Sequence, residues 1–149
     1  MDPALLRVVI VAGVIVVAVL VGRWWQRRDG AVRRSGDTAL RRDHLDAVGL
    51  DLAGAQAGAV LLGSSTCTPC DSVKEVLGAL EAERPGFRWV YADAAEHLDL
   101  TQTHRVLRIP TVLVLEPTGR IVARSSGVPQ VDDLRRVLDR GPLLGESAA

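Results

Sequence analysis

The stretch AVLLGSSTCTPC, residues 59–70, holds the only two cysteines of the chain. Its first five residues form a short apolar run typical of a buried strand. Apolar side chains then recur every three or four positions from Cys70 to Leu80, as in an amphipathic helix. Cys67-Thr-Pro-Cys70 therefore lies where a strand ends and a helix begins, and the free N–H groups and dipole of a helix N-terminus stabilise a thiolate. The pattern predicts a redox pair in which Cys67 attacks a disulfide and Cys70 resolves the mixed disulfide.

A zinc site and a pair of inert cysteines are the two other interpretations of this motif. A structural zinc site needs four ligands, and beside the cysteine pair the chain offers only His44, His97 and His104. These histidines form no second paired half-site, although His97 and His104 are spaced to face the same way on a helix. Inert cysteines at a strand-to-helix junction would be a coincidence, and Pro69 suits the first turn of a helix. The spacing favours redox chemistry.

The sequence on either side of this stretch alternates between strand and helix patterns. Residues 45–52, before it, are ambiguous, with a short helix as one option. After it we expect strands at 87–91 and 111–115, a helix within 94–105, and a strand at 121–123 that pairs back as a hairpin. A helix at 131–138 follows. This order predicts an α/β sandwich whose sheet has mixed strand directions.

These residues resemble the thioredoxin superfamily over about residues 59–138. The matching parts are VLLGSS, CTPC, RWVYAD, VLRIPTVLVL, PTGR and SSGVPQVDDL. The resemblance implies a three-layer sandwich and a protein-disulfide oxidoreductase that needs no cofactor and no metal. It also implies that Pro110 forms a cis peptide beside the cysteines, which lets the backbone of Ile109 pair with an extended substrate. By the same resemblance, the substrate-binding residues are Thr68, Pro69, Ile109, Pro110, Thr111 and Gly127.

Two positions depart from the pattern of that family. Its strongest reductants carry Trp directly before the first cysteine, where this chain has Thr66. They also carry a buried Asp six residues before that cysteine, where this chain has Leu61. In the family this Asp helps to move the proton of the resolving thiol, so deprotonation of Cys70 falls to water or another group. The motif also lacks the His that favours an oxidising pair, so we expect a reducing or exchanging role.

The N-terminal part of the chain contains an uninterrupted apolar run, VVIVAGVIVVAVLVG, at residues 8–22. With its apolar flanks the run covers residues 4–25, or about 33 Å of helix, enough to cross the hydrocarbon core. Trp24 and Trp25 suit a membrane interface. A core helix, a strand and a cleaved signal peptide are the alternatives, but the basic residues follow the run and no small-residue cleavage site separates it from Trp25. We therefore expect an uncleaved single-pass anchor in contact with lipid.

Charge gives the expected orientation of this anchor. Residues 1–42 carry 8 basic and 3 acidic groups, and residues 43–149 carry 10 and 15, so the zero net charge is a cancellation. Arginines beside a span stay on the cytoplasmic side, which predicts a cytoplasmic C-terminal domain in the cell membrane. The zero sum argues against a nucleic-acid partner. The expected organisation is an anchor at 1–25, an Arg-rich tether at 26–42 and a thioredoxin-like domain at 43–149.

The expected function is a membrane-tethered thiol–disulfide oxidoreductase that reduces protein disulfides and takes electrons from a partner dithiol or a reductase. Three alternatives stay open. The same chemistry on the outer face of the membrane would make the protein an extracytoplasmic thiol reductant, for example in cytochrome maturation. Thr66 and Leu61 suggest a non-catalytic module that only binds partners on a thioredoxin scaffold. A metal-binding protein is the third alternative.

Overall fold

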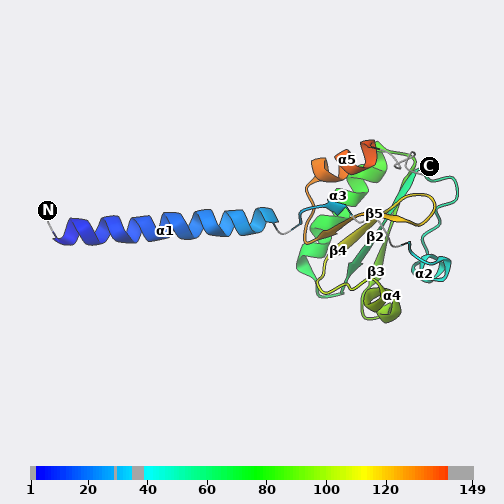
Figure 1. Cartoon of the computed structure of the whole chain (residues 1–149), viewed down its shortest axis with the longest axis horizontal. Coiled ribbons are helices and arrows are strands. Elements are labelled where there is room, and N and C mark those ends of the chain that lie inside the picture. Colours follow the sequence, from blue (N-terminus) through cyan, green and yellow to red (C-terminus); the bar gives the residue numbers. More distant parts are fainter. Residues whose placement is uncertain (1–2, 29, 35–38, 141–149) are drawn as a thin grey trace, which may run out of the picture.

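The computed structural model describes residues 3–28, 30–34 and 39–140. A long helix, α1 (Pro3–Arg28), projects from a domain built on a single sheet (Figure 1). Its segment Leu6–Trp24 is apolar and long enough to cross a membrane, and none of it is buried in the structure. Length and composition fit a membrane span or a signal sequence. The apolar helix predicted around residues 8–22 is present.

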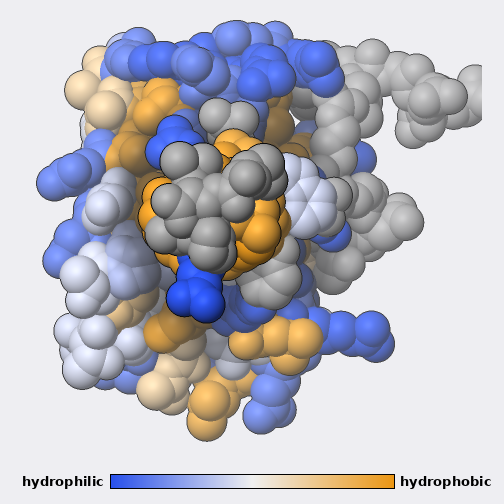
Figure 2. All heavy atoms as spheres, turned by 90° about the vertical axis from the view of Figure 1, so that its left-hand side faces the viewer, coloured by the Kyte–Doolittle hydropathy of each residue, from blue (hydrophilic) through white to orange (hydrophobic). Residues whose placement is uncertain are grey.

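Residues 8–22 of α1 are apolar on all sides of the helix. Figure 2 views the molecule along this helix, which is seen end-on in front of a mostly hydrophilic domain face with hydrophobic side chains near its lower edge. Valine, leucine and isoleucine side chains of the helix are exposed throughout the span. A helical segment without a polar face is typical of a membrane span, a signal sequence or a buried core helix.

The domain sheet has five strands in the order β1-β5-β4-β2-β3. Their bounds are β1 Arg33–Arg34, β2 Ala57–Gly63, β3 Phe87–Asp93, β4 Thr111–Leu115 and β5 Ile121–Ser126. β2 is parallel to β3 and antiparallel to β4, and β5 is antiparallel to both β4 and β1. The domain helices are α2 Arg42–Val48, α3 Thr68–Glu83, α4 Leu98–Thr103 and α5 Val131–Asp139. The predicted α/β architecture with mixed strand directions is confirmed.

Apolar side chains fill both faces of the sheet, because consecutive residues of a strand point to opposite faces. Val60 and Leu62 of β2 pack with residues of α2 and α4, whereas Ala59 and Leu61 pack with residues of α3 and α5. All four are fully buried. The continuous apolar run of β2 is therefore that of a central strand covered on both faces, and the domain has three layers (Figure 1).

Several elements differ in extent from the sequence prediction, and β2 and β3 are each two residues longer than expected. The helix expected within 94–105 is limited to α4, and a turn precedes it in which the Asp93 carboxylate accepts a hydrogen bond from the N–H of Ala95 (2.9 Å). β5 continues beyond residue 123, because its pairing with β4 extends to Ser126 opposite Thr111. The ambiguous residues 45–52 contribute to α2 and to the extended chain after it.

The Arg-rich segment predicted as a tether is partly built into the domain. β1 pairs with β5, the N–H of Gly30 donates to the carbonyl of Ser126 (2.6 Å), and the hydroxyl of Ser125 donates to the carbonyl of Gly30 (2.8 Å). Gly30 has a φ of +91°, and a Cβ there would lie 2.1 Å from the carbonyl oxygen of Val128, so glycine is required. Leu40 is 3% exposed and joins the core. A two-residue strand has no apolar alternation, so this pairing left no pattern in the sequence.

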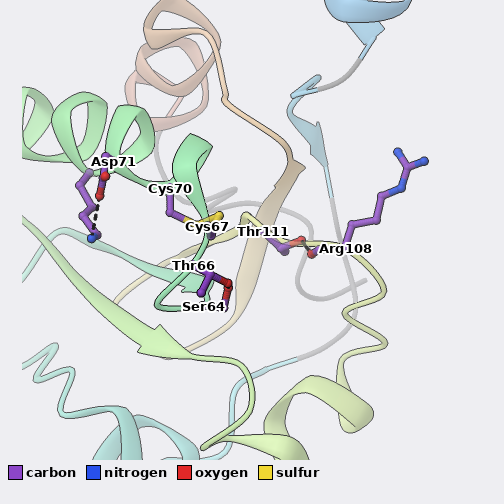
Figure 3. Close-up of a disulfide and its surroundings, with 8 residues drawn as sticks. Ser64, Thr66, Cys67, Cys70, Asp71, Arg108 and Thr111 are labelled. Carbon is purple, nitrogen blue, oxygen red and sulfur yellow. Dashed lines mark hydrogen bonds and ion pairs between the residues drawn. A yellow bond between two sulfur atoms is a disulfide. The ribbon is translucent and has the colours of Figure 1, made fainter.

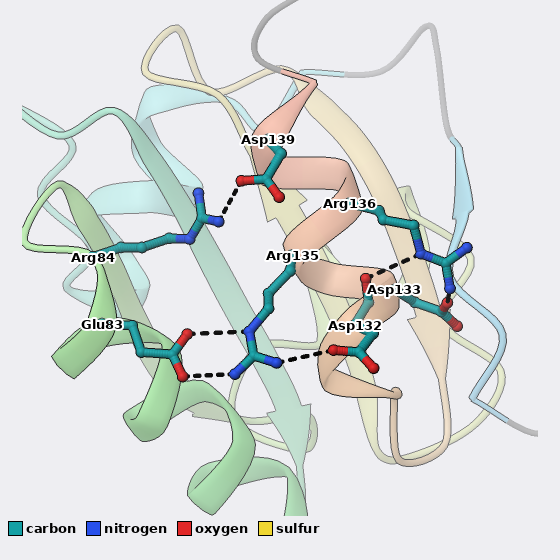
Figure 4. Close-up of polar contacts among 7 residues, drawn as sticks. All are labelled: Glu83, Arg84, Asp132, Asp133, Arg135, Arg136 and Asp139. Carbon is teal, nitrogen blue, oxygen red and sulfur yellow. Dashed lines mark hydrogen bonds and ion pairs between the residues drawn. The ribbon is translucent and has the colours of Figure 1, made fainter.

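Ion pairs join the end of α3 to α5 (Figure 4). The Arg135 guanidinium donates to both carboxylate oxygens of Glu83 (2.6 and 3.1 Å) and to Asp132 (2.9 Å). Arg84 pairs with Asp139 beside it. The hydrogen bond from Arg135 lowers the pKa of Glu83. These groups are exposed to solvent, so the pairs fix the relative position of the two helices more than they add stability.

The place of Leu40 in the core gives a test of where the domain begins. Leu40→Ala should lower the free energy of unfolding by about 2 to 5 kcal/mol, because it removes buried methyl groups and leaves a cavity. Leu98→Ala, at a leucine that is 58% exposed, should change it by less than about 0.5 kcal/mol. Denaturant unfolding of the full chain in detergent measures both values. Equal values would place residue 40 outside the folded domain.

Candidate active site at the start of α3

Cys67 and Cys70 form a disulfide at the N-terminus of α3 (Figure 3). Cys67 is the residue directly before the helix and is partly exposed, whereas Cys70 lies in the first turn and is 1% exposed. The N–H of Cys70 donates to the carbonyl of Cys67 (3.0 Å), and Pro69 occupies the first turn as predicted. Solvent therefore reaches the pair from the side of Cys67, at the helix end where N–H groups favour a thiolate.

The loop before β4 lies beside this disulfide and contains a cis peptide between Ile109 and Pro110, as expected from the resemblance. Pro110 is buried, and Ile109 is 42% exposed. The hydroxyl of Thr111 donates to the carbonyl of Arg108 (2.7 Å), and the N–H of Gly127 donates to the carbonyl of Pro110 (2.8 Å). Figure 3 shows Thr111 next to the cysteines and the Arg108 side chain directed away from them. The structure thus brings the predicted loop residues together around the disulfide.

The sulfur of Cys70 packs against the backbone at the end of β2. A Cβ on Gly63 would lie 2.7 Å from Sγ of Cys70 and 2.9 Å from Cε2 of Tyr91, so both groups occupy the space that a side chain would need. Lys74 follows Cys70 by one helical turn, and its ammonium lies 4.8 Å from the centre of the Tyr91 ring. The same ammonium donates to Asp71 (3.0 Å). Burial, followed by the negative charge of Asp93, raises the pKa of Tyr91.

Gly63, Lys74 and Tyr91 were missed as site residues by the sequence analysis. Lys74 carried a usable signal, because it is the only lysine of the chain and stands four residues after Cys70, on the same helix face. Tyr91 carried none, since its position depends on the parallel register that places it opposite Leu61. Leu61 itself is fully buried in the apolar core.

A groove of about 630 Å³ opens on the α3 side of Cys67, between the start of α3 and the end of β3. The carboxylates of Asp71, Asp93 and Glu96 line it, together with Lys74, which is paired with Asp71. We call this the acidic groove. His97 also lines it.

The other two histidines lie away from the cysteines. His44 and His104 are buried with ring centroids 5.9 Å apart, and Nε2 of His44 lies 2.7 Å from Oδ2 of Asp99. They belong to the α2 and α4 side of the sheet, opposite α3 (Figure 1). Among the described residues no group of three or more His, Cys, Asp or Glu side chains is arranged to hold a metal ion.

Comparison with known proteins places the domain among thioredoxin folds. No family model matches the sequence, and no curated protein matches it. Solved structures do match: mitochondrial thioredoxin 3 from Saccharomyces cerevisiae (19% identity, TM-score 0.53, 64% of this chain and 87% of that one) and thioredoxin NaTrxh from Nicotiana alata (21%, 0.54, 73% and 98%). Fasciola hepatica thioredoxin is a third (23%, 0.53, 64% and 91%). The chain has the thioredoxin fold, and the expected three-layer architecture is confirmed.

The close contact at Gly63 predicts opposite effects for the same substitution at two glycines. Gly63→Ala should lower the free energy of unfolding by about 1 to 3 kcal/mol, because the new methyl group displaces the Cys70 sulfur or the Tyr91 ring. Gly78→Ala, inside α3 with no atom within 4 Å of the added Cβ, should raise it by about 0.5 to 1 kcal/mol. Unfolding of the two oxidised variants measures both effects. A neutral result at Gly63 would contradict the described packing of Cys70.

Proposed function

We propose that the protein is a membrane-tethered thiol–disulfide oxidoreductase that reduces protein disulfides. The observation that carries the proposal is the cysteine pair at the N-terminus of α3, with Cys67 open to solvent and Cys70 buried behind it. The thioredoxin fold supports it, because the solved neighbours named above are thioredoxins. One accessible sulfur and one protected sulfur suit a nucleophile and a resolving thiol, respectively.

The proposed reaction begins from the dithiol form. The thiolate of Cys67 attacks one sulfur of the substrate disulfide, which forms a mixed disulfide and releases the other substrate sulfur as a thiolate. The thiolate of Cys70 then attacks the sulfur of Cys67, which forms the bond seen in the structure and releases the second substrate thiolate. The two protons lost by the cysteines neutralise the two substrate thiolates through solvent. A partner dithiol or a reductase returns two electrons to the protein.

The loop around Ile109 is the proposed docking edge for the substrate chain. The backbone of this exposed residue is available for pairing with an extended peptide, and Pro110 and Thr111 hold the loop beside the disulfide. Thr68 and Pro69 form the opposite side of the contact, next to Cys67, and Gly127 holds the loop from β5. Backbone pairing does not depend on the side chains of the substrate, which suits an enzyme that acts on many protein disulfides.

We propose that the environment of Cys70 determines how fast this thiol attacks the mixed disulfide. By sequence position, Leu61 stands where the strongest reductants of the resembled family carry the Asp that helps to move the proton of the resolving thiol, and it is fully buried. We therefore propose that water or another group accepts this proton and that the protein turns over more slowly than those reductants. The proposed function does not include replacing those general thioredoxins in the cell.

The proposed organisation is an anchor at residues 1–25, an Arg-rich connection at 26–42 and a thioredoxin-like domain at 43–149, with β1 and the buried Leu40 of the connection packed into the domain. Insertion of α1 in the cell membrane would satisfy its exposed apolar surface. The arginines that follow the apolar run support a cytoplasmic domain. A membrane tether raises the effective concentration of the cysteines near membrane substrates, which is a physical reason for the anchor.

Substitution of each cysteine tests the proposed reaction. Cys67→Ser should abolish reduction of insulin by the reduced full chain in detergent, because it removes the nucleophile. Cys70→Ser should instead accumulate a mixed disulfide between Cys67 and insulin, since the resolving step is lost. Turnover assays and non-reducing electrophoresis measure the two outcomes. Equal rates for the wild type and Cys67→Ser would favour a non-catalytic binding module.

Accessibility of the chain ends tests the proposed orientation. In a Cys67→Ser/Cys70→Ser background, Ala149→Cys should resist a membrane-impermeant thiol reagent in intact cells, and Asp2→Cys should react with it. Labelling of both positions after the cells are opened is the control for reactivity. Labelling at residue 149 from outside would place the domain on the outer face and favour the extracytoplasmic reductant.

A further inference from the structure

A second concave surface lies on the other side of the cysteine loop. It is a pocket of about 600 Å³. Its lining includes Arg33, Arg105, Leu107, Arg108, Arg124 and Ser126, and we call it the basic pocket. Among the described residues that line it, none carries a carboxylate. Four guanidinium groups therefore surround one small hollow next to the proposed active site.

The basic pocket shares its wall with the loop that frames the disulfide. Arg108 directly precedes the Ile109–Pro110 peptide, and its carbonyl accepts the hydroxyl of Thr111 (2.7 Å). The Thr111 hydroxyl also lies 3.3 Å from that of Ser126, which lines the pocket. A peptide paired with the backbone of Ile109 therefore passes the mouth of the basic pocket within a few residues of its reactive cysteine.

The fold places two of these arginines against each other, with no carboxylate paired to either among the residues that the structure describes. Arg33 and Arg124 are direct partners in the antiparallel β1–β5 pair, so their side chains leave the same face of the sheet. Like charges in this position are destabilising. Arg124 is held there, since its guanidinium donates to the carbonyls of His104 (2.7 Å) and Arg105 (2.9 Å). Within the described residues no carboxylate forms an ion pair with Arg33, Arg105 or Arg124.

Other arginines of the domain differ in this respect from Arg33, Arg105 and Arg124. Arg41, Arg84, Arg120, Arg135 and Arg136 each pair with a carboxylate of the chain. A repulsive pair that none of the described residues neutralises is the kind of local conflict found at binding sites. The neutralising group would then come from the ligand, and guanidinium groups bind carboxylates in a defined geometry.

We propose that the basic pocket binds an Asp or Glu side chain of the substrate, located on one side of the reactive cysteine. This inference rests on the proposed function and adds a substrate class: protein disulfides flanked by acidic residues. Leu107, which is 90% exposed at the pocket, offers an apolar contact to the neighbouring substrate residue. The hollow shape suits a side chain better than a flat lipid surface.

The acidic groove makes the preference directional. Asp71, Asp93 and Glu96 lie on the opposite side of the disulfide from the basic pocket, and Figure 3 shows Asp71 and Arg108 on opposite sides of the cysteines. An acidic residue on that side of the substrate cysteine is repelled. The protein therefore distinguishes the order of charges along a substrate chain and not only its net charge.

Two isomeric peptides test this inference without any difference in composition or net charge. One has two Glu before and two Gln after a central cysteine, and the other has the reverse order; each cysteine carries the same small neutral thiol as a disulfide. The reduced full chain in neutral phosphatidylcholine nanodiscs is mixed with each peptide in a single turnover, which needs no reductase. The second-order rate constants should differ about three- to tenfold, as expected for partly exposed ion pairs, and the ratio should fall at high salt.

Removal of two exposed pocket charges, those of Arg33 and Arg105, supplies the matched variants. Arg33→Gln/Arg105→Gln should bring the ratio of the two rate constants close to one. Arg88→Gln, at an exposed arginine of β3 on the opposite edge of the sheet, should keep the wild-type ratio. Each single variant, Arg33→Gln and Arg105→Gln, should give an intermediate ratio, which guards against a folding defect in the double variant.

The other outcomes each overturn the inference in a distinguishable way. Equal rates of the wild type with both isomers would remove the acidic preference but keep the proposed reductase. An unchanged ratio in the double variant would assign the preference to the acidic groove alone. Loss of the wild-type preference when phosphatidylglycerol is added to the nanodiscs would show that lipid headgroups occupy the pocket. Failure of both peptides to react would overturn the proposed function together with this inference.

Discussion

Burial of β2 on every side constrains the rest of the domain. Its two edges are paired with β3 and β4, and its two faces are covered by the helices, so the strand is open only at its ends. The chain leaves the carboxyl end at Gly63, which has no side chain and so gives its space to the sulfur of Cys70 and the ring of Tyr91. A reactive group supported by this strand must appear at that end, where the N-terminus of α3 favours a thiolate.

Features that depend on short stretches of chain were predictable from the sequence. β2, β4, α3 and the cysteine pair each carry their pattern within about a dozen residues, and the structure has them as expected. Features that depend on the register between paired strands were not predictable from the sequence. Tyr91 lies beside Gly63, next to the sulfur of Cys70, only through the parallel pairing of β2 with β3, and Arg33 meets Arg124 only through a two-residue strand. No periodicity in a short polar segment reveals a partner so far along the chain.

The charge of the chain is organised at two scales. Along the sequence, a basic N-terminal part precedes an acidic domain, and the sums cancel. Within the domain, the fold separates the signs again: carboxylates of Asp71, Asp93 and Glu96 collect on one side of the disulfide, and arginines from β1, β5 and the loop before β4 collect on the other. The resulting electrostatic field is directed across the cysteines, and it orients a charged substrate chain before the two molecules touch.

The pairing of β1 with β5 also limits how far the domain can travel from its helix. Gly30 is hydrogen-bonded to Ser126 only two residues after α1 ends at Arg28, and one residue spans at most about 3.5 Å. With α1 in a bilayer, this short connection keeps the cysteines close to the membrane surface. A free connection of 17 residues would allow them to move much farther from it. Disulfides close to the membrane plane are then in range, and those on the distal parts of tall membrane proteins are out of range.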